Sequence, residues 1–150
     1  MGVEIERKFL VIGPGWKSGH SVEIVQGYLN RDPARTVRIR VAGESAFLTV
    51  KGLSVGATRA EFEYAIPLED SEQLLSLCGG SLLSKTRHFV RHGGFLWEVD
   101  EFHGKLEGLV LAEVELPSEG AEISKPGWVG EEVTNNPAYY NSRLDAYEES

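Results

Sequence analysis

Acidic and basic side chains alternate with other residues at the start of the chain, in the order Glu4, Glu6 and Lys8. In a strand, alternate side chains point to the same face, so all three charged groups would share it. Two neighbouring carboxylates repel each other without a counter-ion, and hard divalent cations take carboxylate oxygens as ligands. The spacing therefore indicates a strand that presents a metal-binding pair of carboxylates beside an ammonium group.

The same pattern recurs along the chain as pairs of like charge at positions i and i+2. The further acidic pairs are Glu61/Glu63, Glu98/Asp100 and Glu113/Glu115, and the basic pairs are Arg38/Arg40 and Lys85/Arg87. Lys51 and Arg59 fall on the same faces. Charges sorted in this way suit a site that gathers acids for a metal ion and bases for a polyanion.

A solvated outer face on a β-sandwich is the simpler interpretation of any one of these strands. It explains the pairs poorly, because adjacent like charges destabilise a sheet and a solvated face gains from mixed signs. Alternation alone leaves open whether the charged face points inward. If it does, the apolar outer face needs helices and a dimer partner, or another partner, to cover it.

Eight stretches with a two-residue alternation must position these side chains, and turn residues such as Gly93-Gly94 separate them. They span 3–11, 22–30, 35–42, 45–52, 58–66, 83–92, 94–102 and 109–116. Two helices are expected, one capped by Asp70 or Ser71 and running through Leu77, the other near 137–147. The prediction is a mainly β (α+β) fold, an eight-stranded antiparallel closed β-barrel with two or three flanking helices.

The overall composition is that of one soluble globular domain spanning 1–150, with 41% hydrophobic and 25% charged residues. A net charge of -8 argues against non-specific nucleic-acid binding, which usually goes with a basic excess. The single cysteine, Cys78, cannot form an internal disulfide and suits a reducing compartment. With no bilayer-spanning run and no signal-peptide pattern, we expect a cytoplasmic protein without a membrane partner.

The ordered set of motifs resembles the CYTH superfamily, also called triphosphate tunnel metalloenzymes. The resemblance starts at the Glu-x-Glu-x-Lys signature of Glu4, Glu6 and Lys8 and covers nearly the whole chain. It continues through 26–29, 37–40, 48–52, 59–63, 85–87, 97–100, 112–116 and 130–134. The family fold is an eight-stranded antiparallel barrel with a charged tunnel, so the resemblance implies that the charged faces point inward.

Within the superfamily, the short chain and the stretches 26–29 and 85–87 resemble bacterial members that hydrolyse inorganic tripolyphosphate. The implied reaction is metal-dependent phosphoryl transfer to water, which yields pyrophosphate and phosphate and depends on positioning and charge neutralisation. The alternatives are a class IV-type adenylyl cyclase, a thiamine or nucleoside triphosphatase, and a non-catalytic polyphosphate-binding sensor. We find no stretch suited to a base-and-ribose pocket, and the many carboxylates argue against a mere anion sensor.

The resemblance also implies roles for individual side chains. Phosphate-binding positions are Lys8, Arg38, Arg40, Lys51, Lys85 and Arg87, because guanidinium and ammonium groups suit phosphate oxygens. Arg59 either joins them or orients two carboxylates, Glu61 and Glu63, by ion pairs. The implied ligands of Mg²⁺ or Mn²⁺ are Glu4, Glu6, Asp100, Glu113 and Glu115, with Glu61 and Glu63 as further candidates.

Four residues are expected close to the reacting atoms, namely Lys85, Glu6, Asp100 and Tyr28. A second metal ion near Glu6, Asp100 and Glu115 would make a bound water more acidic and aim it at a terminal phosphorus. Tyr28 is either a strand tyrosine with a hydrogen-bonded hydroxyl or a phosphate contact beside Lys85. The residues near 137–147 are expected to plug or flank the tunnel.

Overall fold

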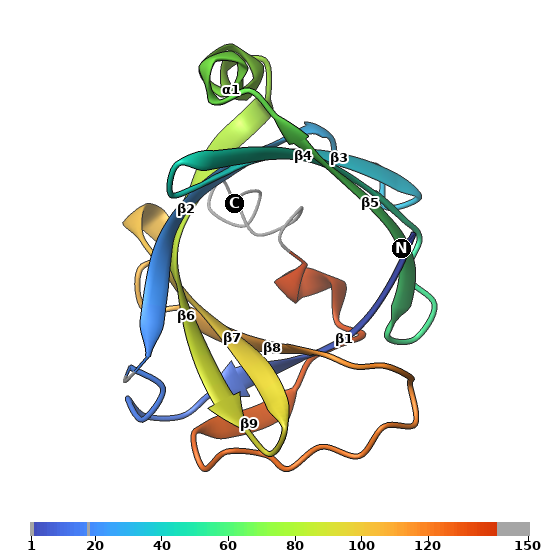
Figure 1. The fold of residues 1–150 in the computed structure, drawn as a ribbon, viewed down its shortest axis with the longest axis vertical. Helices are drawn as coiled ribbons and strands as arrows, with labels where there is room; N and C mark the ends of the chain where they lie inside the picture. Colours follow the sequence, from blue (N-terminus) through green and yellow to red (C-terminus); the bar gives the residue numbers. More distant parts are fainter. Residues whose placement is uncertain (1, 18, 141–150) are drawn as a thin grey trace.

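The computed structural model describes residues 2–17 and 19–140, which form nine strands, one α-helix and two 3₁₀ turns (Figure 1). The strands are β1 (Val3–Val11), β2 (His20–Asn30), β3 (Arg35–Ala42), β4 (Ser45–Gly52), β5 (Thr58–Ile66), β6 (Gly79–His92), β7 (Phe95–Phe102), β8 (Val110–Glu115) and β9 (Val129–Glu132). The helix α1 (Leu68–Ser76) follows β5, and the 3₁₀ turns are Gly104–Leu106 and Pro137–Tyr139.

The first eight strands close into an antiparallel barrel, as Figure 1 shows in a view along its opening. The order around the ring is β5-β4-β3-β2-β6-β7-β8-β1, and β1 pairs with β5 to close it. β1 pairs with its two neighbours along different parts of its length: residues 3–5 pair with β5 and residues 6–10 pair with β8. The predicted eight-stranded closed barrel is confirmed.

β9 is a ninth strand that the sequence analysis did not predict. It pairs antiparallel with the end of β1, where Phe9 lies opposite Glu132 and Val11 opposite Val129. Outside the barrel, Arg7 donates two hydrogen bonds to Glu132, at 2.9 and 2.6 Å. Four residues are too few to show a reliable alternation, so only the pairing partner on β1 reveals this strand.

The expectation of two or three α-helices is wrong for the described residues, where α1 is the only one. α1 also begins earlier than predicted, at Leu68, because Pro67 has a fixed φ of −61° and no N–H to satisfy. Asp70 therefore lies in the first turn, where its charge complements the helix dipole. Of the second predicted helix, only the 3₁₀ turn Pro137–Tyr139 is seen, and 141–147 lie outside the described residues.

The larger apolar core lies outside the barrel wall, whereas a smaller cluster of Leu83, Phe102 and Leu111 lies on the inner face, where Phe102 is opposite Lys85 and Leu111 opposite Asp100. Phe9, Trp97 and Val99 are fully buried beneath two chain connections that carry Trp16 and Trp128. His88 also lies on the outer wall, with its ring 4.9 Å from that of Trp16. On another part of the wall, α1 packs across β2, β3 and β4.

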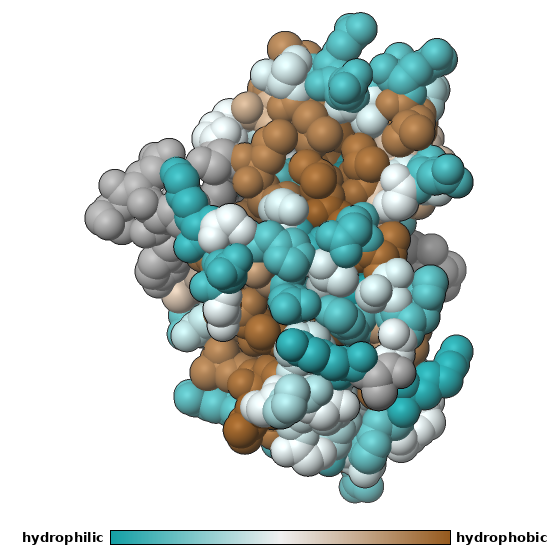
Figure 2. All heavy atoms as spheres, turned by 90° about the vertical axis from the view of Figure 1, so that its left-hand side faces the viewer, coloured by the Kyte–Doolittle hydropathy of each residue, from teal (hydrophilic) through white to brown (hydrophobic). Residues whose placement is uncertain are grey.

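Part of the apolar outer wall remains uncovered. Figure 2 shows apolar side chains gathered on the upper part of one face of the molecule. Leu77 and Leu82, next to α1 in the sequence, are 71% and 45% exposed. No helix in the described part of the chain is both long and apolar enough to cross a bilayer.

A charged tunnel as the candidate active site

The barrel encloses a cavity of about 270 Å³ whose lining is almost entirely charged or polar. The predicted side chains at its surface are Glu4, Glu6, Lys8, Tyr28, Arg38, Arg40, Lys51, Arg59, Glu61, Glu63, Arg87, Glu113 and Glu115. Glu98, the partner of Asp100 in its acidic pair, lines it as well. The charged faces of the strands therefore point inward.

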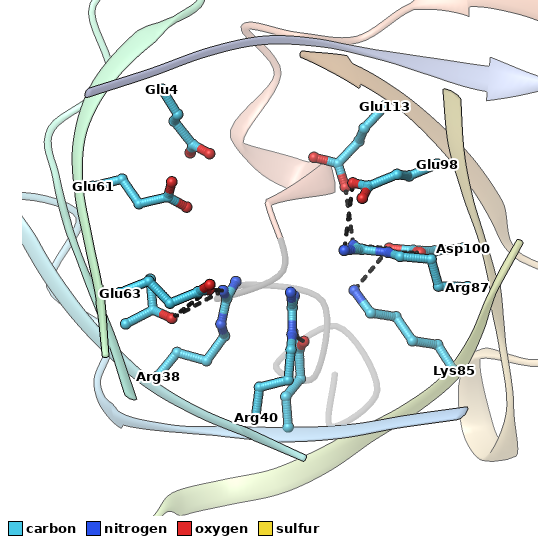
Figure 3. Close-up of polar contacts among 12 residues, drawn as sticks. Glu4, Arg38, Arg40, Glu61, Glu63, Lys85, Arg87, Glu98, Asp100 and Glu113 are labelled. Carbon is cyan, nitrogen blue, oxygen red and sulfur yellow. Dashed lines mark hydrogen bonds and ion pairs between the residues drawn. The ribbon is translucent and has the colours of Figure 1, made fainter. Parts of the chain in front are cut away.

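Some acidic and basic groups lie on opposite sides of the cavity, although Lys51 and Arg87 lie among the acids. Figure 3 shows Arg38 and Arg40 reaching into the cavity from one side, with Glu4 and Glu113 on the opposite side. The strand register brings the acids together, since Glu6 of β1 lies opposite Glu115 of β8 and Glu98 of β7 opposite Glu113. An anion at the basic wall would thus face carboxylates across the cavity.

Lys51 bridges two of the acidic residues. Its Nζ lies 2.7 Å from Glu4 Oε1 and 3.6 Å from Glu61 Oε2. Burial raises the pKa of Glu4, and Lys51 opposes that shift by attracting the charged carboxylate. Lys51 is therefore engaged with carboxylates in this structure.

Arg38 is held by its neighbours on the next two strands. Its Nη2 donates to Thr49 Oγ1 at 3.3 Å and lies 3.8 Å from Glu63 Oε2. Thr49 in turn donates to Glu63 at 3.2 Å, so the three side chains form one network. Arg59 lines the cavity too, but its Nε finds no hydrogen-bond partner within the described residues.

Asp100 joins two cations, Arg87 in the cavity lining and the fully buried Lys85. Its carboxylate accepts hydrogen bonds from Arg87 Nε at 2.8 Å and Nη2 at 3.0 Å. Lys85 Nζ lies 2.8 Å from Asp100 Oδ2, and both of these side chains are almost completely buried. Burial opposes the charge on Asp100, yet Arg87 and Lys85 hold its pKa well below the usual range.

Lys85 has a lower pKa than the buried Arg40 and therefore loses its proton more readily. Burial lowers its pKa to about 7, although Asp100 favours the charged form. Despite its ion pair, Lys85 Nζ donates no well-aligned hydrogen bond within the described part of the chain. Unlike Arg87, neither Lys85 nor Asp100 belongs to the cavity lining, so two of the four predicted catalytic residues are buried next to it, while Glu6 and Tyr28 line it.

Glu6 and Glu113 form a pair of carboxyl groups across β1 and β8. Burial and the neighbouring Glu113 raise the pKa of Glu6 well above the usual range. Although burial alone would raise the pKa of Glu113, Lys8, Glu6 and Arg87 hold it well below the usual range. The pKa values of the two carboxyl groups are therefore shifted in opposite directions, as expected when two close carboxylates repel each other.

This set of oxygen donors fits a hard divalent cation, which would offset the repulsion between the carboxylates. Glu4, Glu6, Glu113 and Glu115 are the lining residues best suited to hold it, with Glu61 and Glu63 nearby. Among the described residues, no three such groups already form a compact ligand cluster. The donor chemistry therefore fits the metal, while the final ligand set stays a prediction.

One part of the cavity is bounded by residues that follow β9. Thr134 and Tyr140 contribute to the lining, and Lys8 Nζ donates to the backbone oxygen of Tyr139 at 3.0 Å. Tyr139 also packs against the apolar cluster around Leu111. The segment predicted to plug or flank the tunnel thus contacts a predicted phosphate-binding lysine.

Several lining residues escaped the sequence analysis because they carry no charge. Thr36, Thr49 and Thr134 are examples, and Gln26 lies buried beside the cavity in contact with Arg40. Strand alternation could have identified two of them, because Gln26 lies on the same strand face as Tyr28, and Thr49 lies on the same face as Lys51. Tyr28 itself is buried in the lining, and Arg31 lies 5.5 Å from the centre of its ring.

Comparison with known proteins places this cavity in a family. A family model described as a CYTH domain matches residues 2–146. An inorganic triphosphatase from Acetivibrio thermocellus is 48% identical over 146 residues, covering 96% of this chain and 94% of that protein. One from Nitrosomonas europaea is 39% identical, covering 94% and 95%. A crystal structure of an inorganic triphosphatase has a TM-score of 0.69 at 38% identity, covering 97% of this chain and 95% of that one.

Proposed function

This chain belongs to the CYTH family, and we propose that it hydrolyses inorganic tripolyphosphate to pyrophosphate and phosphate within its barrel. The observation that carries the proposal is the cavity within the closed barrel, in which Arg38 and Arg40 face the carboxylates of Glu4 and Glu113. A linear polyphosphate offers negative charge along its whole length and needs no other recognition. Such a cavity suits the positioning and charge neutralisation that phosphoryl transfer requires.

The basic side chains would bind the phosphate groups. Arg38, Arg40 and Arg59 reach the cavity surface from β3 and β5, and arginine presents several donors in a plane that matches phosphate oxygens. Lys8 and Lys51 would supply further positive charge after leaving their present partners, Tyr139 and Glu4. The remaining proposed contacts are Arg87, at the surface, and Lys85, behind it.

The family is metal-dependent, and we propose Mg²⁺ or Mn²⁺ as the ion, held by the lining carboxylates around Glu4, Glu6 and Glu115. When bound, such an ion would shield phosphate charge and make a coordinated water more acidic. Asp100 is the least available of the proposed ligands, because both its oxygens are engaged by Arg87 and Lys85. Its proposed part in catalysis is therefore to hold these two cations in place.

Tyr28 and Lys85 are the proposed proton-handling groups. Tyr28 lies in the cavity lining, next to the basic wall, with Arg38 opposite it in the strand register. Lys85, with its pKa near 7, can exist as a neutral amine at a pH where the other buried cations keep their charge. A group that gains and loses a proton near neutral pH is suited to take one from an attacking water.

The reaction products distinguish this proposal from its alternatives. Phosphorus NMR should show tripolyphosphate converted into equal amounts of pyrophosphate and phosphate when Mg²⁺ or Mn²⁺ is present. Cyclic AMP and pyrophosphate formed from ATP would instead identify a cyclase. Tight tripolyphosphate binding without turnover in either metal would identify a sensor. Faster hydrolysis of thiamine triphosphate or of a nucleoside triphosphate would identify that compound as the preferred substrate.

We also propose that the protein works in the cytoplasm and as a homodimer. The single cysteine is consistent with a reducing compartment, and the exposed Leu77 and Leu82 leave apolar outer wall for a second copy to cover. Light scattering on the purified full chain should give twice the monomer mass. The monomer mass would refute the dimer without affecting the proposed reaction.

A further inference from the structure

Gln26 is a fully buried polar residue that contacts one of the arginines in the basic wall. It lies on β2 directly opposite Arg40 of β3 in the strand register. Its Oε1 accepts a hydrogen bond from Arg40 Nε at 2.9 Å. The other end of the amide, Nε2, has no hydrogen-bond partner among residues 2–17 and 19–140. A buried amide with an unused donor is costly, so its presence calls for a reason.

The neighbouring arginines are held differently. Arg87 is bound through its Nε and Nη2 by the carboxylate of Asp100, and Arg38 has Glu63 at 3.8 Å. Arg40 has no carboxylate partner within the described residues, and its Nε is held by the neutral oxygen of Gln26. Its charge is thus the least compensated of the three. In agreement, burial and then Arg38 and Arg87 lower the pKa of Arg40 to about 9.

Holding a guanidinium at Nε fixes the direction of its other edge. A guanidinium has five N–H donors, and the four on its terminal nitrogens remain for a ligand when Nε is occupied. Figure 3 shows the terminal nitrogens of Arg40 pointing into the cavity. A carboxylate at position 26 would orient Arg40 equally well but would cancel the positive charge that a polyphosphate needs.

We propose that Gln26 is a positioning residue that aims Arg40 at the substrate while leaving its positive charge uncompensated. The proposal rests on the proposed function, because it assumes that the ligand of the basic wall is a polyphosphate. A carboxylate of the same size would orient Arg40 but neutralise its charge, and an apolar side chain would leave the charge but not orient Arg40. Gln26 acts through Arg40 and is not itself placed in contact with the reacting atoms.

The test is calorimetric binding of tripolyphosphate to chelator-treated protein, so that binding is measured without turnover. Gln26→Glu preserves the size and the contact to Arg40 but adds a negative charge, and it should weaken binding about tenfold or more. Gln26→Met removes the contact without adding charge, and it should weaken binding less than Gln26→Glu. The control is Gln73→Glu, which adds the same charge at the other glutamine of the chain. Gln73 is exposed on α1, so this variant should leave the affinity for tripolyphosphate unchanged.

Arg40→Ala provides the decisive background. If Gln26 acts through Arg40, Gln26→Met should cause no further loss of affinity once Arg40 is gone, since this variant adds no charge of its own. A loss that persists there would overturn the proposal, as would wild-type affinity in a folded Gln26→Glu protein. Should Gln26→Glu fail to fold, the Met variant alone and combined with Arg40→Ala completes the comparison.

Failure of this inference can be told apart from failure of the proposed function. If the wild type binds tripolyphosphate but never hydrolyses it with Mg²⁺ or Mn²⁺, the proposed function is wrong and the binding cycle still tests Gln26. If hydrolysis proceeds and Gln26→Glu binds normally, the proposed function stands and the role of Gln26 is refuted. A change in KM without a matching change in kcat should accompany the loss of affinity.

Discussion

Asp100 binds Arg87 with both carboxylate oxygens, and one of these oxygens also lies 2.8 Å from the buried ammonium of Lys85. One negative charge therefore serves two cations that have little access to water. Removing a partner from a buried ion pair leaves an uncompensated charge, which costs far more than an exposed pair contributes. We therefore expect the positions of Arg87 and Lys85 to depend on the carboxylate of Asp100.

Asp100→Asn should destabilise the fold by about 3–5 kcal/mol, because Arg87 and Lys85 would share a neutral partner. Urea unfolding at pH 7 measures the effect. Glu98→Gln is the matched control, since its carboxylate lies 3.4 Å from the same Arg87 but is 34% exposed. It should cost no more than about 1 kcal/mol. Equal losses in the two variants would show that Asp100 has no special structural role.

The buried Lys85 predicts the direction of the pH dependence. Burial lowers its pKa from 10.5 to about 7, so the neutral amine becomes available as pH rises through about 7. If this amine accepts a proton during the reaction, kcat/KM should rise through the same pH, because kcat/KM reports groups of the free enzyme. Rates measured from pH 5 to 9 at saturating metal test this.

Lys85→Arg keeps the positive charge but stays protonated over this range, so it should be slow and lack the rise near pH 7. Lys17→Arg changes an exposed lysine in the same way and should behave as wild type. A fall in wild-type kcat/KM through pH 7 would instead mean that the ammonium form is active. Lys85 would then be only an electrostatic clamp.

Tyr28→Phe removes one hydroxyl from the cavity lining while keeping a buried ring under Arg31. If the hydroxyl contacts phosphate or assists proton transfer, kcat should fall about tenfold or more, in the range of a lost catalytic group. Steady-state kinetics with tripolyphosphate measure this, and thermal unfolding checks that the fold is kept. An unchanged kcat would leave Tyr28 as a packing residue of β2.

Glu4→Gln and Glu115→Gln should each raise the Mg²⁺ concentration needed for half-maximal rate by about tenfold, because each removes one carboxylate ligand. Titrating the rate with Mg²⁺ at fixed tripolyphosphate measures the shift. Glu131→Gln, on the exposed part of β9, makes the same change outside the cavity and should not alter the titration. If all three variants titrate alike, Glu4 and Glu115 are not ligands.

The strands were predictable because their alternation is strong and most of them carry charged side chains on one face. Arg38 and Arg40, or Glu113 and Glu115, mark both a strand and its charged face by parity alone. Alternation could not tell inside from outside, and only the family resemblance resolved that point. β9 escaped because Val129–Glu132 is too short to show a period, and its partner on β1 is distant in the sequence.

Site residues were predictable where charge marked them and not where burial decided their role. The sequence gives Lys85 and Arg87 the same face, yet Arg87 reaches the cavity and Lys85 lies behind it, paired with Asp100. Gln26 has the parity of Tyr28 but no charge, so its contact with Arg40 emerges only from the strand register. These distinctions depend on the neighbours that pack around each side chain, such as Phe102 opposite Lys85, which spacing does not encode.

Tripolyphosphate hydrolysis is best tested by the initial rate of phosphate release from tripolyphosphate, compared with ATP, in the presence of Mg²⁺, of Mn²⁺ or of chelator. We expect fast release from tripolyphosphate that stops on chelation and returns when metal is added, with much slower release from ATP. Folded protein that releases no phosphate from tripolyphosphate with either metal would contradict the proposed function.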